Sequence, residues 1–166
     1  MQDPFSEERL GKVFKCNTNN PYKLISRESS TLEFKESFNV QTLWKYAKTM
    51  AAFANKDGGY IIFGVKDKPR TVVGLNNDVF ESFDDEKMVK RLNECFAPEI
   101  RYERRTVSYE EVNIGVIYVY TSKNKPIICK ESYQSGGKPV LREGAIYYRY
   151  NGQTSEIKYS DLIMLL

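Results

Sequence analysis

Three acidic residues stand at positions where their carboxylates could act together. Glu28 and Glu33 are five residues apart, and Asp67 follows the apolar run 60–65. If the strand that carries Glu33 is the neighbour of the strand before Asp67, the three carboxylates meet near one end of a sheet. Mg²⁺ and Mn²⁺ prefer such oxygen ligands, and the ion could activate a water molecule against a phosphodiester. The spacing therefore permits a divalent-metal site in which all three residues are metal-binding and catalytic.

The same residues also have a structural interpretation. Three carboxylates among 22 acids can be ordinary surface residues. The alternation of the strand predicts that Glu33 and Lys35 face outward together, where they could simply form a salt bridge. In the functional interpretation, Lys35 presents a point charge to a phosphate. The residues alone leave both interpretations open.

The turn Asp57-Gly58-Gly59 has two interpretations as well. The backbone N–H groups of a glycine-rich turn can cradle a phosphate. More often such a turn only connects a helix tightly to a strand. The chain contains no G-x-x-x-x-G-K-[ST] run, so a P-loop nucleotide hydrolase is not indicated.

Several kinds of chemistry are excluded by residue type. The chain has no histidine, which removes imidazole bases and His-ligated zinc. Cys16, Cys95 and Cys129 are far apart and show no C-x-x-C spacing, so neither a zinc site nor a disulfide framework is expected. Isolated thiols are typical of a reducing compartment.

The elements that must position the acids can be read from periodicity. Alternating apolar residues predict a strand over 30–37. A helix of about fourteen residues should follow, opening at Asn39 or Gln41 and ending at Asn55 in the left-handed conformation. The nearly continuous apolar run 60–65 predicts a central strand that is covered on both faces.

The rest of the chain reads mainly as strands. A short helix is expected within 5–14, a loop over 17–21, a second helix over 84–96 capped by Asp84, and a closing helix over 159–166 capped by Ser160. Strands are expected over 100–107, 112–120, 126–130, 139–142 and 145–150. This order predicts an α+β fold with a mixed sheet, two main helices and short terminal helices.

Length and composition fit one globular domain. The chain has 166 residues, of which 41% are hydrophobic and 28% charged. The net charge is only +3, which by itself does not indicate a nucleic-acid binder. No stretch has the roughly 18–20 apolar residues that span a bilayer, and the start lacks a signal-peptide pattern. We therefore expect a cytoplasmic protein without a membrane partner. The apolar end is also compatible with a chain that continues beyond Leu166.

Three runs in combination resemble a known family. They are E-S-S-T-L-E-F-K at 28–35, A-F-A-N at 52–55 and G-G-Y-I-I-F-G-V-K-D at 58–67. Together they resemble the Schlafen AlbA-type domain family, also called the divergent AAA-type DNA-binding domain. The resemblance covers roughly residues 22–166 and leaves residues 1–21 as an N-terminal extension with a short helix.

The resemblance implies an Alba-like fold and a role in nucleic-acid binding, often as a module of bacterial regulators. Some relatives are RNA endonucleases that cut structured RNA such as tRNA with three carboxylates and a divalent metal, Mg²⁺ or Mn²⁺. Those carboxylates match Glu28, Glu33 and Asp67. The nuclease relatives use two such lobes and this chain has length for one, so a homodimer would have to supply the second.

Two hypotheses follow. The first is a nucleic-acid-binding module, regulatory or defence-related, without catalysis. The second is a metal-dependent RNA endonuclease that uses the three carboxylates. In the first hypothesis, DNA or RNA phosphates and bases are contacted by basic and aromatic side chains. These are Lys35, Lys45, Lys48, Arg104, Arg105, Lys130, Arg142, Tyr147 and Arg149.

Overall fold

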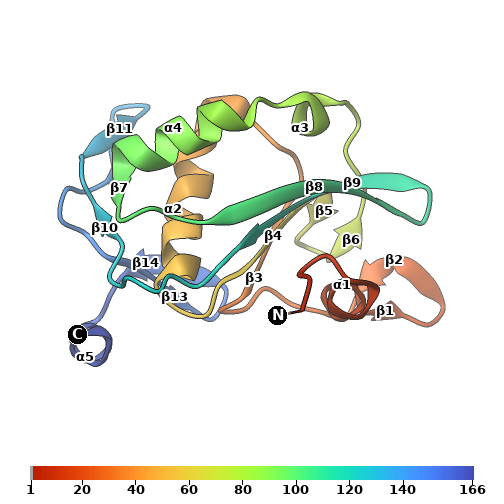
Figure 1. The fold of residues 1–166 in the computed structure, drawn as a ribbon. Coiled ribbons are helices and arrows are strands. Elements are labelled where there is room, and N and C mark those ends of the chain that lie inside the picture. The colour runs from red at the N-terminus through yellow and green to blue at the C-terminus, as the bar shows by residue number, and fades with distance from the viewer. Residues whose placement is uncertain (1) are drawn as a thin grey trace.

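A four-stranded mixed sheet forms the centre of the molecule (Figure 1). The computed structural model describes residues 2–166. In spatial order, the strands are β3 (Leu32–Lys35), β4 (Gly59–Phe63), β9 (Val112–Val119) and β8 (Tyr102–Tyr109). β3 runs parallel to β4, and the other pairs are antiparallel. The strand of Glu33 is therefore the neighbour of the apolar strand before Asp67, which confirms the predicted pairing.

Helices cover one face of this sheet. They are the 3₁₀ turn η1 (Val40–Thr42), α2 (Leu43–Ala54), α3 (Val79–Ser82) and α4 (Asp85–Cys95). α2 can approach the sheet closely because its buried side includes Ala47, Ala51 and Ala54. The core between these helices and the sheet also contains Ile61 and Phe63 of β4.

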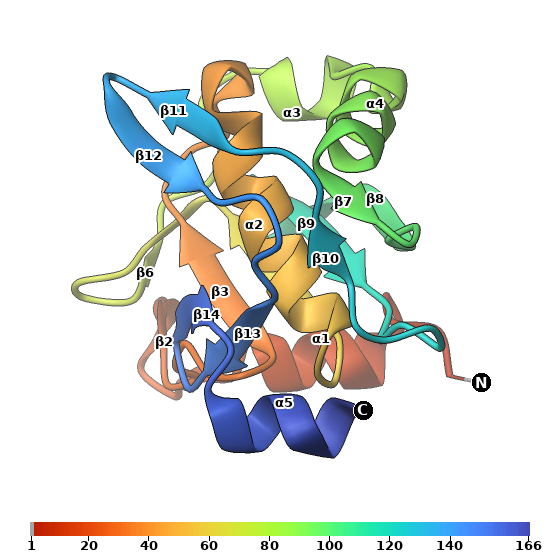
Figure 2. The same cartoon turned by 90° about the vertical axis from the view of Figure 1, so that its left-hand side faces the viewer.

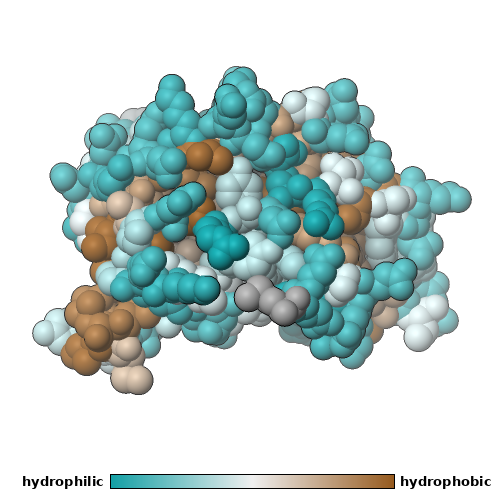
Figure 3. All heavy atoms as spheres, viewed as in Figure 1, coloured by the Kyte–Doolittle hydropathy of each residue, from teal (hydrophilic) through white to brown (hydrophobic). Residues whose placement is uncertain are grey.

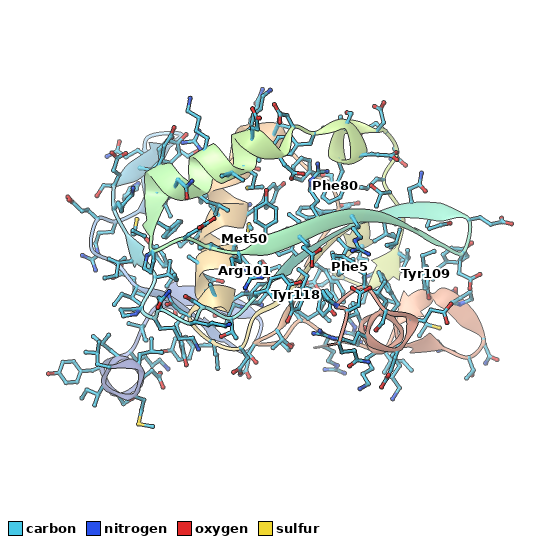
Figure 4. All side chains as sticks on the ribbon, viewed as in Figure 1. Phe5, Met50, Phe80, Arg101, Tyr109 and Tyr118 are labelled. Carbon is cyan, nitrogen blue, oxygen red and sulfur yellow. The ribbon has the colours of Figure 1, made fainter. Side chains whose placement is uncertain are left out.

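The other face of the sheet is covered by the N-terminal segment and by residues 65–72. Here lie α1 (Glu7–Val13) and a second sheet of β1 (Cys16–Asn17), β2 (Asn20–Leu24), β6 (Thr71–Val72) and β5 (Val65–Lys66). Figure 4 shows Phe80 on one side of the β8–β9 ribbon and Phe5, Tyr109 and Tyr118 on the other. The two hydrophobic cores thus lie on opposite faces of one sheet.

Three small pairs of strands complete the chain. They are β7 (Phe96–Ala97) with β10 (Ile128–Cys129), β11 (Tyr133–Ser135) with β12 (Lys138–Leu141), and β13 (Tyr147–Tyr150) with β14 (Gln153–Glu156). Figure 2 shows β12, β14, β2 and β6 toward the same side of the molecule. The last helix, α5 (Tyr159–Leu165), protrudes as an apolar patch (Figure 3).

The predicted fold class is confirmed, as are the main elements. The strands near β3, β4, β8 and β9 and the two main helices lie where periodicity placed them, and the Asp84 side chain caps α4 by accepting from the Glu86 N–H at 3.0 Å. The predicted loop over 17–21 is too long, since only Thr18 and Asn19 lie outside the strands. Asn17 and Asn20 instead bound a tight hairpin turn, because Asn17 Oδ1 accepts from the Asn19 N–H at 3.0 Å.

Details at element ends differ from expectation for identifiable reasons. Asn55 ends α2 in right-handed geometry with φ −75°, and Gly58 takes the positive φ of +76° instead. The run 60–65 divides at Gly64, whose φ of +108° turns the chain into the second sheet. Lys158, rather than Ser160, stands at the N-cap of α5.

None of the helices formed by residues 2–166 is both long enough and apolar enough to cross a membrane.

Candidate functional site

Glu28 and Glu33 occupy one end of the β3 region. Glu33 lies on β3 opposite Ile61 of β4, and Glu28 lies on the segment that leads into β3. The Phe34 N–H donates to Glu28 Oε2 at 3.0 Å, which fixes this carboxylate against the strand. Gly152, in the β13–β14 turn, packs so close that a Cβ placed there would lie 3.0 Å from the Cβ of Glu28. Residues far apart in sequence therefore pack around Glu28.

The ionisation of Glu28 is strongly disfavoured. Burial is the largest cause, followed by hydrogen bonding with Glu33 and by repulsion from Glu33 and Asp67, and together they raise the pKa of Glu28 to about 7. The hydrogen bond from the Phe34 N–H acts in the opposite direction. Asp67 follows β5, is half-buried, and acts on Glu28 through this repulsion. The three acids therefore lie close enough to influence one another.

Glu33 is not the outward-facing residue that strand alternation predicted. Its relative exposure is only 9%, and the fully buried Arg149 of β13 lies against its carboxylate. Arg149 Nη1 lies 3.3 Å from Glu33 Oε1, and Lys35 Nζ lies 3.4 Å from Glu33 Oε2. Both carboxylate oxygens of Glu33 thus face cations.

The ion pairs of Glu33 limit its use as a ligand of a metal ion. Among residues 2–166, no three or more His, Cys, Asp or Glu side chains are placed to share one ion. In this same part of the chain, no cation lies within ion-pair distance of the carboxylate of Glu28 or of Asp67. For Glu33 to ligate an ion, it would have to leave Arg149 or Lys35. The set as arranged therefore fits a three-carboxylate metal site only in part.

Two of the predicted nucleic-acid contacts are structural residues. Arg149 is fully buried, lies over the ring of Phe53, and donates to the carbonyls of Ser29 (2.7 Å) and Leu32 (3.1 Å). Burial lowers its pKa despite the nearby Glu33. Arg104 is held just as firmly, by Asp85 at 2.9 Å and by the carbonyls of α3 and the following residue. Both guanidinium groups hold elements together.

Three other predicted contacts meet in one groove. Lys48, Arg142 and Tyr147 line a groove of about 600 Å³ between α2, the β11–β12 hairpin and the β13–β14 hairpin. Lys48 Nζ lies 4.9 Å from the centre of the Tyr147 ring. Lys45 is exposed one turn earlier on α2. We refer to this feature as the α2 groove.

The partners of the groove residues limit what they can contact. The Tyr147 hydroxyl accepts from the Arg142 N–H at 3.0 Å, and only 3% of Tyr147 is exposed. The Arg142 side chain pairs with Glu156 at 2.5 Å but remains 61% exposed. Lys48 is therefore the groove cation that is free of an acidic partner within the described residues.

The remaining predicted contacts lie apart from the groove. Arg105 is exposed on β8, 3.7 Å from Glu103 and over the ring of Phe5. Lys130 is exposed beyond β10, and its backbone N–H donates to Cys95 at 2.6 Å.

The Asp57-Gly58-Gly59 turn is packed internally. A Cβ at Gly59 would lie 2.7 Å from the Thr31 carbonyl oxygen and 2.9 Å from the Phe53 ring. The Gly58 N–H donates to the Phe53 carbonyl at 2.8 Å. These contacts favour the tight helix-to-strand connection over a phosphate cradle.

The structure also brings together a group of basic residues that the sequence patterns did not predict as a site. Lys23, Arg27 and Arg70 line a pocket of about 330 Å³ between the end of β2 and the β5–β6 turn. A local signal existed, because Lys66, Lys68 and Arg70 fall within five consecutive residues. That signal was weak without the pairing of β2 with β6, which brings Lys23 and Arg27 to the same place.

Glu28→Gln is expected to stabilise the protein at alkaline pH. The folded pKa of about 7 lies above the ordinary 4.5, so the folded state binds the proton more tightly. Stability from this group is complete below the ordinary pKa and is lost as pH rises through the folded pKa. Allowing for solvent screening of a half-exposed group, the gain at about pH 8 should be roughly 1 kcal/mol.

Urea unfolding at about pH 5 and about pH 8 measures this effect, with Glu81→Gln on α3 as an exposed control. The stability difference between Glu28→Gln and wild type should widen at the higher pH, whereas that of the control should not. An equal difference at both pH values would contradict the raised pKa of Glu28.

Comparison with known proteins places the chain in a family. The model of the Schlafen, AlbA_2 family matches residues 28–158. A curated relative from Ureaplasma parvum serovar 3, named "Uncharacterized ATP-binding protein UU034", is 38% identical over 173 residues. The alignment covers 96% of this chain and 48% of that protein, so the chain spans about half the length of its relative.

A solved structure agrees with the fold, and a second is similar in sequence. The DIP2311 protein of Corynebacterium diphtheriae matches with a TM-score of 0.54 and 15% identity, over 82% of this chain and 23% of that chain. The N-terminal domain of a RecG-related protein from Nitrosomonas europaea matches with a TM-score of 0.42 and 26% identity, over 71% of this chain and 80% of that chain. The family match covers most of the residues and includes Glu28, Glu33 and Asp67. The chain therefore belongs to the Schlafen AlbA_2 family.

Proposed function

We propose that this domain binds nucleic acid, as a regulatory or defence-related module. The observation that carries the proposal is the α2 groove, in which Lys48, Arg142 and Tyr147 line one concave surface of about 600 Å³. Membership of the family supports the same role. Lysines at a groove attract phosphates, and their binding releases counterions from the nucleic acid.

The contacts expected in the groove follow from exposure. Lys45 and Lys48 stand one helical turn apart on α2 and would contact successive phosphates. Tyr133, half-buried at the groove wall under Arg91, offers a ring face to an unpaired base more readily than buried Tyr147.

Binding to single-stranded and duplex DNA and RNA should weaken steeply with salt. Two to three phosphate contacts predict a loss of roughly ten- to fiftyfold between about 50 and about 200 mM salt. Fluorescence anisotropy with labelled oligonucleotides measures this dependence. The double variant Lys45→Gln/Lys48→Gln should bind more weakly and show a shallower salt slope.

A second double variant, which also removes two lysine charges, serves as the control for Lys45→Gln/Lys48→Gln. Lys87→Gln/Lys90→Gln removes two exposed charges from α4 that do not line the groove, and should leave the affinity within about twofold. Equal weakening in both double variants would mean that net charge, rather than the α2 groove, governs binding. No binding by the wild type to any of these nucleic acids would end the proposal.

A second candidate function is a divalent-metal-dependent endoribonuclease that acts on structured RNA such as tRNA. It is favoured by the mutual influence of Glu28, Glu33 and Asp67, since clustered carboxylates would be relieved by a bound Mg²⁺ or Mn²⁺. Such an ion would supply an activated water molecule when bound. Glu28 and Asp67 are the residues free to hold it without disturbing an ion pair of the described chain.

The structure determines which variant tests this activity. Glu33→Ala would remove the partner of buried Arg149 and confuse loss of activity with loss of folding. Asp67→Asn avoids that problem, and Asp78→Asn at an exposed position is its control. Mn²⁺-dependent tRNA cleavage that Asp67→Asn abolishes and Asp78→Asn retains would support the nuclease. Intact tRNA with wild-type protein and Mn²⁺ would exclude it for this substrate.

A further inference from the structure

The pocket between β2 and the β5–β6 turn has an unusual concentration of positive charge. Lys23, Arg27 and Arg70 line it, and Lys66 and Lys68 belong to the adjoining β5–β6 hairpin. None of the five lies within ion-pair distance of a carboxylate among residues 2–166. By contrast, Arg104, Arg142 and Arg149 all have acidic partners. We refer to this feature as the basic pocket.

The backbone around the basic pocket is fixed. The Leu24 N–H donates to the Arg70 carbonyl at 2.9 Å, and Lys23 pairs in register with Thr71 of β6. Arg70 Nε lies 3.4 Å from the Leu24 carbonyl, which holds this guanidinium at the pocket wall. Lys23 and Arg27 are exposed and remain free to reach a ligand. Pairing of β2 with β6 therefore brings the cations together before any ligand binds.

The pocket also has an apolar wall. Ile25 lines it and is 51% exposed, which is high for a large aliphatic side chain. An anion with an attached sugar or base would use both the cations and this wall. A small inorganic anion would use only the cations.

The location of the pocket connects it to the proposed function. Arg27 precedes Glu28 directly, and the turn that contains Arg70 also contains Asp67. Glu28 packs against Gly152 in the β13–β14 turn, and β14 borders the α2 groove. Figure 2 shows β12, β14, β2 and β6 toward one side of the molecule. β12 and β14 border the α2 groove, and β2 and the β5–β6 turn border the basic pocket, so the elements that line the two features lie on that side.

We propose that the basic pocket binds a phosphate group, with Arg27 and Arg70 contacting its oxygens and Lys23 adding charge. Guanidinium forks match phosphate oxygens in geometry, and the absence of acidic partners in the described chain leaves them available. This inference deepens the proposed nucleic-acid binding: a strand in the α2 groove would pass the carboxylates and place a phosphate in the pocket. The same chemistry would accept the phosphates of a free nucleotide.

The test compares Lys23→Gln/Arg27→Gln with wild type and with the control Lys87→Gln/Lys90→Gln. Arg70 is left intact because it also contacts the Leu24 carbonyl. Each protein is titrated with a labelled oligonucleotide and, separately, with ATP, at several salt concentrations. The pocket variant should bind its ligand roughly tenfold more weakly and lose about two phosphate contacts from the salt slope, whereas the control should not. Thermal unfolding verifies that all three proteins are folded.

The outcomes separate this inference from the proposed function. Weakened oligonucleotide binding supports a nucleic-acid phosphate in the pocket. ATP binding that weakens in the pocket variant, with no oligonucleotide binding by wild type, supports a nucleotide phosphate and overturns the nucleic-acid function. Unchanged oligonucleotide affinity and slope, with no effect on ATP, overturns the pocket and leaves the function standing. No binding of either ligand by wild type overturns both.

Discussion

Replacing Arg149 with methionine is expected to lower the free energy of unfolding by about 3–5 kcal/mol. The guanidinium of Arg149 is fully buried and lies 3.3 Å from the carboxylate of Glu33. It also donates to Thr154 Oγ1 at 3.1 Å and to two backbone carbonyls. Methionine fills much of the space but leaves Glu33 half-neutralised in a buried site and the carbonyls without a donor.

Arg142→Met provides a matched control, because Arg142 also pairs with a glutamate. The Arg142–Glu156 pair is shorter, at 2.5 Å, but its side chains are 61% and 48% exposed. Exposed pairs contribute roughly 0–1 kcal/mol, so the control should unfold close to wild type in urea. Burial, rather than the distance between the charges, therefore predicts the effect.

A third variant isolates the pair itself. Adding Glu33→Gln to Arg149→Met removes the uncompensated carboxylate and should recover part of the lost stability. Equal urea midpoints for Arg149→Met and Arg142→Met would show that Arg149 does not hold β13 to β3 as described.

Asn55→Ala is expected to lower the free energy of unfolding by roughly 3 kcal/mol. The Asn55 side chain is fully buried at the end of α2. Its Nδ2 donates to the carbonyls of Ile127 (3.1 Å) and Tyr147 (2.9 Å), and its Oδ1 accepts from the Ile127 N–H at 2.7 Å. Alanine would leave three buried backbone groups without partners.

Two comparisons make this prediction specific. Asn93→Ala, at an exposed position on α4, should change stability by no more than about 0.5 kcal/mol. Asn55→Asp keeps an acceptor for Ile127 but loses both donated hydrogen bonds, so it should also be strongly destabilising. Hydrogen exchange should become faster in β13, because Asn55 anchors Tyr147. Slow exchange in β13 of a folded Asn55→Ala protein would refute the anchoring role.

Asn55 also illustrates how a local prediction can be right about position and wrong about role. The sequence pattern placed the end of a helix at Asn55, and α2 does end there. The expected left-handed conformation belongs instead to Gly58, which adopts it without a Cβ clash. What the side chain does depends on Ile127 and Tyr147, which lie 72 and 92 residues further along the chain.

The basic residues likewise have positions that the sequence shows and roles that depend on tertiary contacts. Exposure and pairing decide whether a cation can contact phosphate, and neither follows from residue type. Arg104 and Arg149 are held by internal partners, whereas Lys23 and Arg27 are exposed beside a pocket. No local pattern separates these pairs, because their surroundings come from strands that are distant in sequence.

The sequence alone determined the order of the main elements and the neighbourhood of the acids. Alternation marked β3, the small-residue stripe marked α2, and the apolar run marked β4, because these periods arise from backbone geometry within a few residues. Only the tertiary structure decided which of these carboxylates is paired with a cation and which has a raised pKa. Glu33 is paired with Arg149 from 116 residues away, whereas burial, together with the neighbouring Glu33 and Asp67, raises the pKa of Glu28. Burial and ion pairing are set by non-local packing, so the same acids could be located from the sequence but not assigned their electrostatic roles.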